Sequence, residues 1–172
     1  MPTYAINKRA NFDYEILNKI EAGIVLAGYE VKSIKTGHIS LKEAFVTLKK
    51  DSPRKMPLGG NSAKSGIISR GKDLPDAYLT NCHIPLYKHA GNIDNYEPTR
   101  PRKLLLKKSE IRHLIGKIQE KGLTLVPIKV YNKGSLIKLS FGVGKGKKKI
   151  DKREGIKRRE TDRNLRRIQK QY

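Results

Sequence analysis

The sequence has no tryptophan and a single cysteine, Cys82, among its 172 residues. One cysteine excludes an internal disulfide framework and any zinc site that is built from several cysteines. Long apolar stretches are also missing, because no window holds the roughly 20 uninterrupted apolar residues of a membrane-spanning helix. The first residues lack the apolar core of a secretory signal. We therefore expect a cytoplasmic protein with no membrane partner.

Signatures of catalysis and of metal binding are missing as well. The segment 142–147 (GVGKGK) resembles a phosphate-binding loop, but its glycine spacing is one residue too short and no Ser or Thr follows the lysine. None of the four histidines shows the spacing of a known metal-binding motif: His38, His83, His89 and His113. We predict that the protein is not an enzyme and uses no metal, cofactor or small-molecule substrate.

Positive charge is abundant, since 38 Lys and Arg stand against 16 Asp and Glu, for a net charge of +22. Such an excess repels itself in a compact chain and favours a polyanionic partner, of which nucleic acid is the usual one. Residues 145–172 have a net charge of +9, which leaves +13 on residues 1–144. Because this tail has few apolar residues, we expect it to be disordered until a polyanion neutralises it, and then helical.

Apolar and β-branched residues predict short strands over most of the first 143 residues. The clearest strands are 123–131 and 135–143, and residues 132–134 should join them as a three-residue hairpin loop that ends in glycine. Pro127 has no N–H to donate, so it should lie at a sheet edge or a β-bulge. Further strands are predicted at 14–21, 23–26, 43–48 and 78–84.

Two helices are predicted between these strands. A short one should span residues 29–34. A longer one is indicated by apolar residues that recur at i, i+3, i+4 and i+7, namely Ile111, Leu114, Ile115 and Ile118. Ser109 should cap its N-terminus, and Gly122 should end it in the C′ position. Several short strands, glycine turns and these helices indicate a small β-barrel with helices packed outside it.

Two basic segments each allow two interpretations. Residues 49–77 are punctuated by glycine and proline and show no sustained period. They form a long surface loop or insertion that either stays solvated or contacts RNA. Residues 98–108 place five basic side chains around three leucines, which should anchor the segment in the core. This block either contacts RNA phosphates or is a basic strand edge that discourages pairing with another sheet.

Four blocks of sequence follow one another in a distinctive order: NKRA at 7–10, EAGIVLAGYEVKSIK at 21–35, NYEPTRPRKLLL at 95–106, and GKGKK at 144–148 with DKR at 151–153. This pattern resembles the SmpB family, also called SsrA-binding or tmRNA-binding proteins. The resemblance covers nearly the whole chain apart from about 51–77. Four blocks in the right order are far more specific than any single short motif.

The resemblance implies a mainly β protein with an OB-fold, a small antiparallel barrel with peripheral α-helices and a disordered basic C-terminal tail. Residues 1–143 would form the RNA-binding domain, with an irregular insertion at about 51–77, and residues 144–172 the tail. The domain would bind the tRNA-like domain of tmRNA, a bacterial RNA, for trans-translation on stalled ribosomes. The tail would enter the empty mRNA channel and decoding centre, beside 16S rRNA, and elongation factor Tu would be an indirect partner through aminoacylated tmRNA.

The resemblance also implies two sets of site residues. Candidates for RNA binding are Asn7, Lys8, Arg9, Glu21, Gly23, Lys32, Arg100, Arg102, Lys103, Leu105 and Lys107. Candidates for the tail's contacts with the ribosome are Lys145, Lys147, Lys148, Asp151, Lys152, Arg153 and Ile168. The alternative function is that of a constitutive ribosomal protein, or another protein that binds a structured RNA, because basic barrels with charged tails also suit that class.

Overall fold

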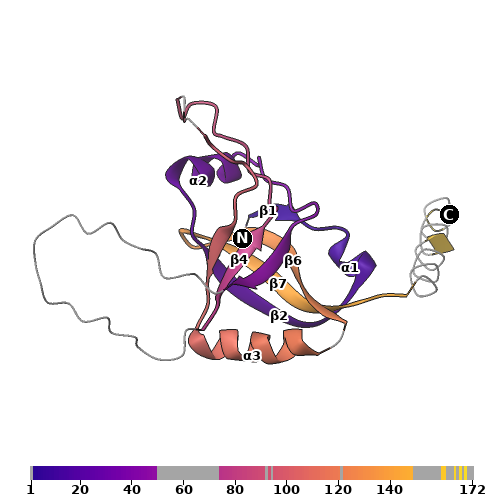
Figure 1. Cartoon of the computed structure of the whole chain (residues 1–172). Coiled ribbons are helices and arrows are strands. Elements are labelled where there is room, and N and C mark those ends of the chain that lie inside the picture. Colours follow the sequence, from indigo (N-terminus) through magenta and orange to yellow (C-terminus); the bar gives the residue numbers. More distant parts are fainter. Residues whose placement is uncertain are drawn as a thin grey trace, which may run out of the picture.

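The computed structural model, shown in Figure 1, describes residues 2–49, 74–91, 93, 95–120 and 122–148, together with residues 160, 161, 165, 167 and 169. Within these residues one seven-stranded antiparallel sheet forms, in the order β1–β6–β7–β2–β5–β4–β3. Its strands are β1 (Thr3–Ile6), β2 (Tyr14–Ile24), β3 (Phe45–Lys49), β4 (Asp76–Thr80), β5 (Arg102–Leu105), β6 (Leu123–Lys133) and β7 (Leu136–Gly146). The helices are α1 (Ala10–Asp13), α2 (Gly28–Lys35) and α3 (Lys108–Gln119).

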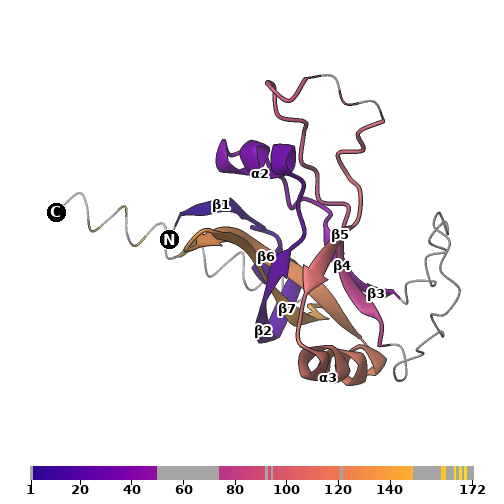
Figure 2. The same ribbon diagram turned by 90° about the vertical axis from the view of Figure 1, so that its left-hand side faces the viewer.

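The sheet curls until β3 contacts β6, although four strands lie between them in the strand order. Helix α3 lies across this junction, because side chains of all three elements line one cavity of about 460 Å³, among them Val46, Ile115 and Leu125. Helix α2 lies at the opposite end of the barrel from α3 in both views (Figures 1 and 2). The predicted antiparallel barrel with helices outside it is confirmed.

Paired residues on neighbouring antiparallel strands project to the same side of a sheet, so the register separates an inner face from an outer one. Ala22 pairs with Leu139, which pairs with Val130, and all three are buried. Leu104 pairs with Ala77, and both are also buried. These residues form the apolar core, and their immediate neighbours along each strand therefore face outward.

Several strands differ in extent from the prediction. β2 is one continuous strand where two were predicted, and it has a register shift between Ile16 and Asn18 that lets it bend. β4 overlaps the predicted 78–84 strand, but it begins earlier, at Asp76, and ends earlier, at Thr80. The residues beyond it hold only an isolated bridge between His83 and Ser40. Cys82 is buried there, while His83 is exposed.

The β6–β7 hairpin is confirmed, but its loop is shorter than predicted. Lys133 pairs with Leu136, so Gly134 and Ser135 alone form the turn. Gly134 has φ of 64°, a conformation that glycine adopts without strain and that two-residue hairpin turns require. The β-bulge expected at Pro127 is confirmed, since the register shifts between Pro127 and Lys129.

The short helix predicted at 29–34 is confirmed as α2, whereas the predicted ends of α3 are wrong. Lys107 rather than Ser109 occupies the N-cap position, and its N–H donates to the Glu110 carboxylate at 2.7 Å. An acidic side chain in the first turn thus accepts from the N–H of the N-cap residue, whereas the serine hydroxyl was expected to accept from the N–H groups of the first turn. The helix ends at Gln119, so Gly122, with φ of 83°, lies one position beyond C′.

The root of the tail belongs to the barrel. β7 continues to Gly146, three residues past the boundary predicted at 143, and the Lys147 N–H donates to the Asp13 carbonyl at 2.9 Å. Most of the predicted insertion at 51–77 and most of the tail lie outside the described residues. Glu160, Thr161, Leu165 and Arg167 are helical. Among the described residues, no helix is long and apolar enough to cross a membrane.

Candidate RNA interface

A row of paired side chains crosses the outer face of the barrel. Gly23 of β2 pairs with Leu105 of β5 on one side and with Lys138 of β7 on the other. Lys138 in turn pairs with Tyr131 of β6. Leu105 is 59% exposed, which is unusual for a leucine and places apolar surface beside a lysine. The row therefore offers a cation, a bare glycine and an apolar side chain to one ligand.

Charged side chains surround Tyr131 on this face. The Lys129 ammonium lies 4.8 Å from the centre of the Tyr131 ring, and Lys133 and Glu21 form an ion pair at 3.1 Å. Burial and the neighbouring Glu21 carboxylate raise the pKa of Tyr131 to about 12, so its hydroxyl stays protonated. That hydroxyl has no hydrogen-bond partner of regular geometry among the described residues. It is buried beside the Glu21 carboxylate and helps to lower the pKa of that group, so it orients Glu21 rather than contacting a ligand itself.

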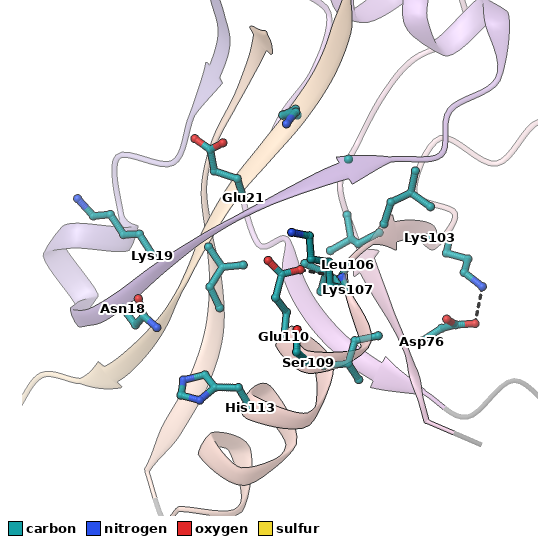
Figure 3. Close-up of a pocket in the computed structure, with 16 residues that line it drawn as sticks. Asn18, Lys19, Glu21, Asp76, Lys103, Leu106, Lys107, Ser109, Glu110 and His113 are labelled. Atoms are coloured by element: carbon teal, nitrogen blue, oxygen red, sulfur yellow. Dashed lines mark hydrogen bonds and ion pairs between the residues drawn. The ribbon is translucent and has the colours of Figure 1, made fainter. Parts of the chain in front are cut away.

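A groove of about 890 Å³ runs between this outer face and the start of α3 (Figure 3). It is open rather than enclosed. In Figure 3, Lys107 and Glu110 lie close together in the middle of the view, and Glu21 lies above them on β2. Five of the predicted RNA-binding residues line it: Glu21, Gly23, Lys103, Leu105 and Lys107. Two of these come from β2 and three from β5 or the residues after it, so the fold unites segments about 80 residues apart in sequence.

Four lysines and three carboxylates line the groove, so its positive charges outnumber its negative ones by one. Lys103 forms an ion pair with Asp76, as the dashed line in Figure 3 shows. Lys138 forms no close ion pair with a described residue, although its charge helps to lower the pKa of the nearby Glu21 carboxyl. Glu110 is engaged by the Lys107 N–H at the start of α3. The groove thus combines lysines that form no close ion pair with a described residue and carboxylates, such as Asp76 and Glu110, that are held by Lys103 and by the Lys107 N–H.

Arg102 has a different role from the one predicted for it. Its side chain is 0% exposed, and its guanidinium pairs with the Glu30 carboxylate of α2, with Nη2 2.8 Å from Oε1. It also donates to the carbonyl oxygens of Cys82 at 2.6 Å and Pro98 at 2.9 Å. The Arg102 guanidinium is therefore enclosed by protein partners and does not line the groove. An enclosed guanidinium with these partners presents nothing to a nucleic acid and instead ties α2 to β5.

Arg100 belongs to the same cluster at its solvent edge. Its guanidinium also pairs with Glu30, and its side chain is one-third exposed. Burial alone would raise the pKa of the Glu30 carboxyl. Hydrogen bonds from Arg100 and the Ala27 N–H, together with Arg102, outweigh burial and hold that pKa below its usual range. The Glu30–Arg100–Arg102 cluster is thus ionised at neutral pH and couples α2 to the strand that bears Leu105.

The predicted N-terminal residues lie apart from the groove, at the root of the tail. Asn7 is held against β6, because its side-chain amide donates to the Pro127 carbonyl at 3.0 Å. Asn7 and Arg9 line a separate cavity, and Lys8 is exposed. The Lys147 ammonium donates to the Asn11 carbonyl at 2.9 Å, which brings the last described basic run of β7 next to α1.

A profile of the family described as "SmpB protein" matches residues 4–54 and 70–171, most of the chain.

The chain belongs to the SmpB family.

Its relatives in that family align over nearly their whole length. The SsrA-binding protein of Gloeothece citriformis is 43% identical over 166 residues, which are 96% of this chain and 92% of that protein. The SsrA-binding protein of Streptococcus uberis is also 43% identical, over 96% of this chain and 91% of its own. A chain in the solved structure "tmRNA-SmpB: a journey to the center of the bacterial ribosome" superposes with a TM-score of 0.58, at 39% identity over 87% of both chains.

The structure places the remaining predicted residues of this SmpB family member that it describes at two further sites. Lys32 lies on α2, outside the groove, 5.7 Å from the centre of the Tyr87 ring. Lys145, Lys147 and Lys148 lie at and just beyond the end of β7. The other predicted tail residues lie outside the described part of the chain: Asp151, Lys152, Arg153 and Ile168. The predicted set is thus not one contiguous site.

Sequence reasoning missed Lys129, Tyr131 and Lys138, which share the outer face with Glu21 and Gly23. A signal was present, because Lys129 and Tyr131 alternate along the predicted strand 123–131 and so project to one side of it. The alternation within one strand does not tell how that strand is paired with its neighbours. Without that pairing, nothing in the sequence places Lys138 beside Gly23.

Proposed function

We propose that this protein binds the tRNA-like domain of tmRNA through the groove and outer face of its barrel, and delivers that RNA to stalled ribosomes for trans-translation. The observation that supports this most directly is the groove itself, where Glu21, Gly23, Lys103, Leu105 and Lys107 meet although two distant segments supply them. The relatives in the family are named for binding the same RNA. Cytoplasmic ribosomes are then the place of action.

The chemistry of the outer face suits RNA. Lys138 and Lys107 can neutralise phosphates, and the exposed Leu105 can pack against a ribose or an unstacked base. Glu21 cannot bind a phosphate, but its carboxylate can accept from a 2′-hydroxyl, which RNA has and DNA lacks. Gly23 leaves space in the middle of the row, so the backbone of the RNA can come close to β2. Recognition of this kind needs no catalytic group.

The tail has a separate task in this proposal. Residues beyond Lys148, with Asp151, Lys152, Arg153 and Ile168 among them, enter the empty mRNA channel near the decoding centre and 16S rRNA. The basic residues at the end of β7 lie beside the N-terminal block, so Lys8 and Arg9 are placed to contact the RNA that surrounds the tail's entry. Elongation factor Tu is engaged only through the aminoacylated tmRNA.

Affinity for tmRNA should depend steeply on salt. If the barrel neutralises about 6 to 8 phosphates, raising the salt from about 50 to 200 mM should weaken binding by about 10³-fold, because condensed counterions are released when the complex forms. Filter binding of the full-length protein to transcribed tmRNA across this range measures the slope. A salt-independent dissociation constant would contradict the proposal. A structured RNA without a tRNA-like domain is the control for specificity, and it should bind more weakly at every salt concentration.

A further inference from the structure

A second cavity lies at the end of α2, far from the groove. It has a volume of about 270 Å³ and is lined by Ser33, Thr36, His38, Pro85, Leu86, Tyr87, Lys88 and His89. We call it the α2 pocket. It shares no lining residue with the groove, and α2 and α3 lie at opposite ends of the barrel in both views (Figures 1 and 2). Its volume is below the roughly 300 Å³ at which pockets begin to enclose a whole small ligand. It suits one planar group of a larger molecule.

Aromatic rings and cations define the chemistry of the α2 pocket. The Tyr87 and His89 rings meet edge to face, with centroids 5.4 Å apart. The Lys32 ammonium lies 5.7 Å from the centre of the Tyr87 ring. Lys88 is exposed on the rim, and Lys35 is exposed in the last turn of α2. No carboxylate is among the described residues that line the pocket. An aromatic ring with cations around it is the arrangement on which nucleic-acid bases stack while their phosphates are neutralised.

The polar groups of the pocket are oriented by their own hydrogen bonds. The Thr36 hydroxyl donates to the Ser33 carbonyl at 2.8 Å, so its oxygen is left to accept. His38 Nδ1 lies 2.9 Å from that oxygen, and we assign it as the donor. The neutral imidazole then has its lone pair on Nε2, at an exposed position. This atom can accept from an N–H on the edge of a base, which gives the pocket a polar contact as well as a stacking surface.

The pocket is held in place from two sides. The Ser33 hydroxyl donates to the Pro85 carbonyl at 2.7 Å, which fixes the 85–89 segment to α2. The Tyr96 hydroxyl donates to the Ile84 carbonyl at 2.6 Å, immediately before that segment. A site that exists before its ligand arrives loses less conformational entropy on binding than one that must form.

We propose that the α2 pocket is a second RNA-contact site that takes one unpaired base from a loop or bulge, stacked on Tyr87. Lys88 and Lys32 neutralise the flanking phosphates, and His38 accepts from the edge of the base. The inference rests on the proposed function in that the protein acts on RNA. The base comes from tmRNA or from ribosomal RNA, and binding to each is measured separately.

The absence of tryptophan from the sequence makes the test direct. Tyr87→Trp introduces a sole tryptophan whose ring can still stack. We expect its fluorescence to be quenched on addition of tmRNA or of a ribosomal RNA fragment. Half of the quenching should be reached at an RNA concentration equal to the dissociation constant. Ile118→Trp, placed at a partly exposed position on α3, is the matched control and should change little. Equal quenching of both variants, or none of Tyr87→Trp by either RNA, would overturn the inference.

Affinity gives an independent readout. Tyr87→Ala should weaken binding to one of the two partners by about tenfold, the lower part of the range found for loss of a base–aromatic stack, while Tyr87→Trp should retain the wild-type affinity. Binding to tmRNA is measured by filter retention and binding to ribosomes by co-sedimentation. Thermal melting of both variants checks the fold. Lys88→Ala provides a further variant, because Lys88 is exposed and its removal should leave the fold intact. Wild-type affinity of Tyr87→Ala for both partners would contradict the inference while leaving the proposed function intact. Failure of the wild-type protein to bind tmRNA would instead contradict the proposed function.

Discussion

Replacing Glu30 by glutamine should lower the free energy of unfolding by about 3 to 5 kcal/mol, the usual cost of removing one partner of a buried ion pair. Glu30 is fully buried and compensates both Arg100 and the enclosed Arg102. A neutral amide of the same shape leaves the Arg102 charge without a counter-ion in the barrel wall. Urea denaturation of Glu30→Gln and the wild type measures the difference. An effect below about 1 kcal/mol, the size expected for an exposed pair, would show that the cluster is not a structural tie.

The Glu30 contribution should also depend on pH. Its folded-state pKa is depressed, so the stabilisation is complete above the ordinary pKa of a glutamate and is lost as the pH falls through the folded value. The stability difference between wild type and Glu30→Gln should therefore be constant around neutral pH and shrink in acid. Asp76→Asn is the matched control, because Asp76 pairs with Lys103 at a partly exposed position. It should cost less than about 1 kcal/mol.

Ending the chain after Lys148 should separate the two tasks of the protein. The barrel with β7 intact should bind tmRNA within about threefold of the full-length affinity at physiological salt, since the groove residues all remain and exposed distant charges are screened. Peptide tagging on stalled ribosomes should be abolished, because no tail remains to enter the mRNA channel. The measurement compares a tmRNA binding curve with tagging in a reconstituted translation system.

The cut must follow Lys148 rather than residue 143. Residues 144–146 pair with β2 and β6, and Lys147 is bonded to α1. A chain that ends at 143 would lose these pairs. A loss of function could then come either from the missing tail or from a less stable barrel. Loss of tmRNA binding after the later cut would contradict the division of labour, as would retention of tagging.

Local patterns were enough to predict most of the elements. The β-branched run at 123–131 and the i, i+3, i+4, i+7 stripe from Ile111 each produced the expected strand or helix. The ends of the elements were harder to predict, because they depend on which polar group accepts from the terminal N–H groups. At the start of α3 the Glu110 carboxylate accepts from the Lys107 N–H, whereas Ser109 was expected to cap the helix. The length of the hairpin loop depended on how far the ladder continues, which only the paired strands decide.

The site was only partly predictable for a related reason. Arg100, Arg102 and Lys103 are adjacent basic residues in one block, and sequence alone gives them one role. Alternation along β5 turns Arg102 inward to Glu30 and leaves Lys103 outward in the groove. The buried carboxylate that pairs with Arg102 lies 72 residues away in the chain. Lys138 was missed because its importance comes from being beside Gly23, and no local pattern reports the register between β2 and β7.

The outer face is the centre of this account, and a single charge reversal tests it most directly. Lys138→Glu puts a carboxylate in the middle of the row that contains Gly23 and Leu105, while Lys42→Glu makes the same change of charge at an exposed residue that does not line the groove. We predict that Lys138→Glu weakens tmRNA binding by about tenfold or more at physiological salt and lowers the slope of affinity against salt by about one phosphate contact or more. Lys42→Glu should stay within about threefold of the wild type. Equal affinities for the two variants, with both folded, would contradict the assignment of this face to RNA.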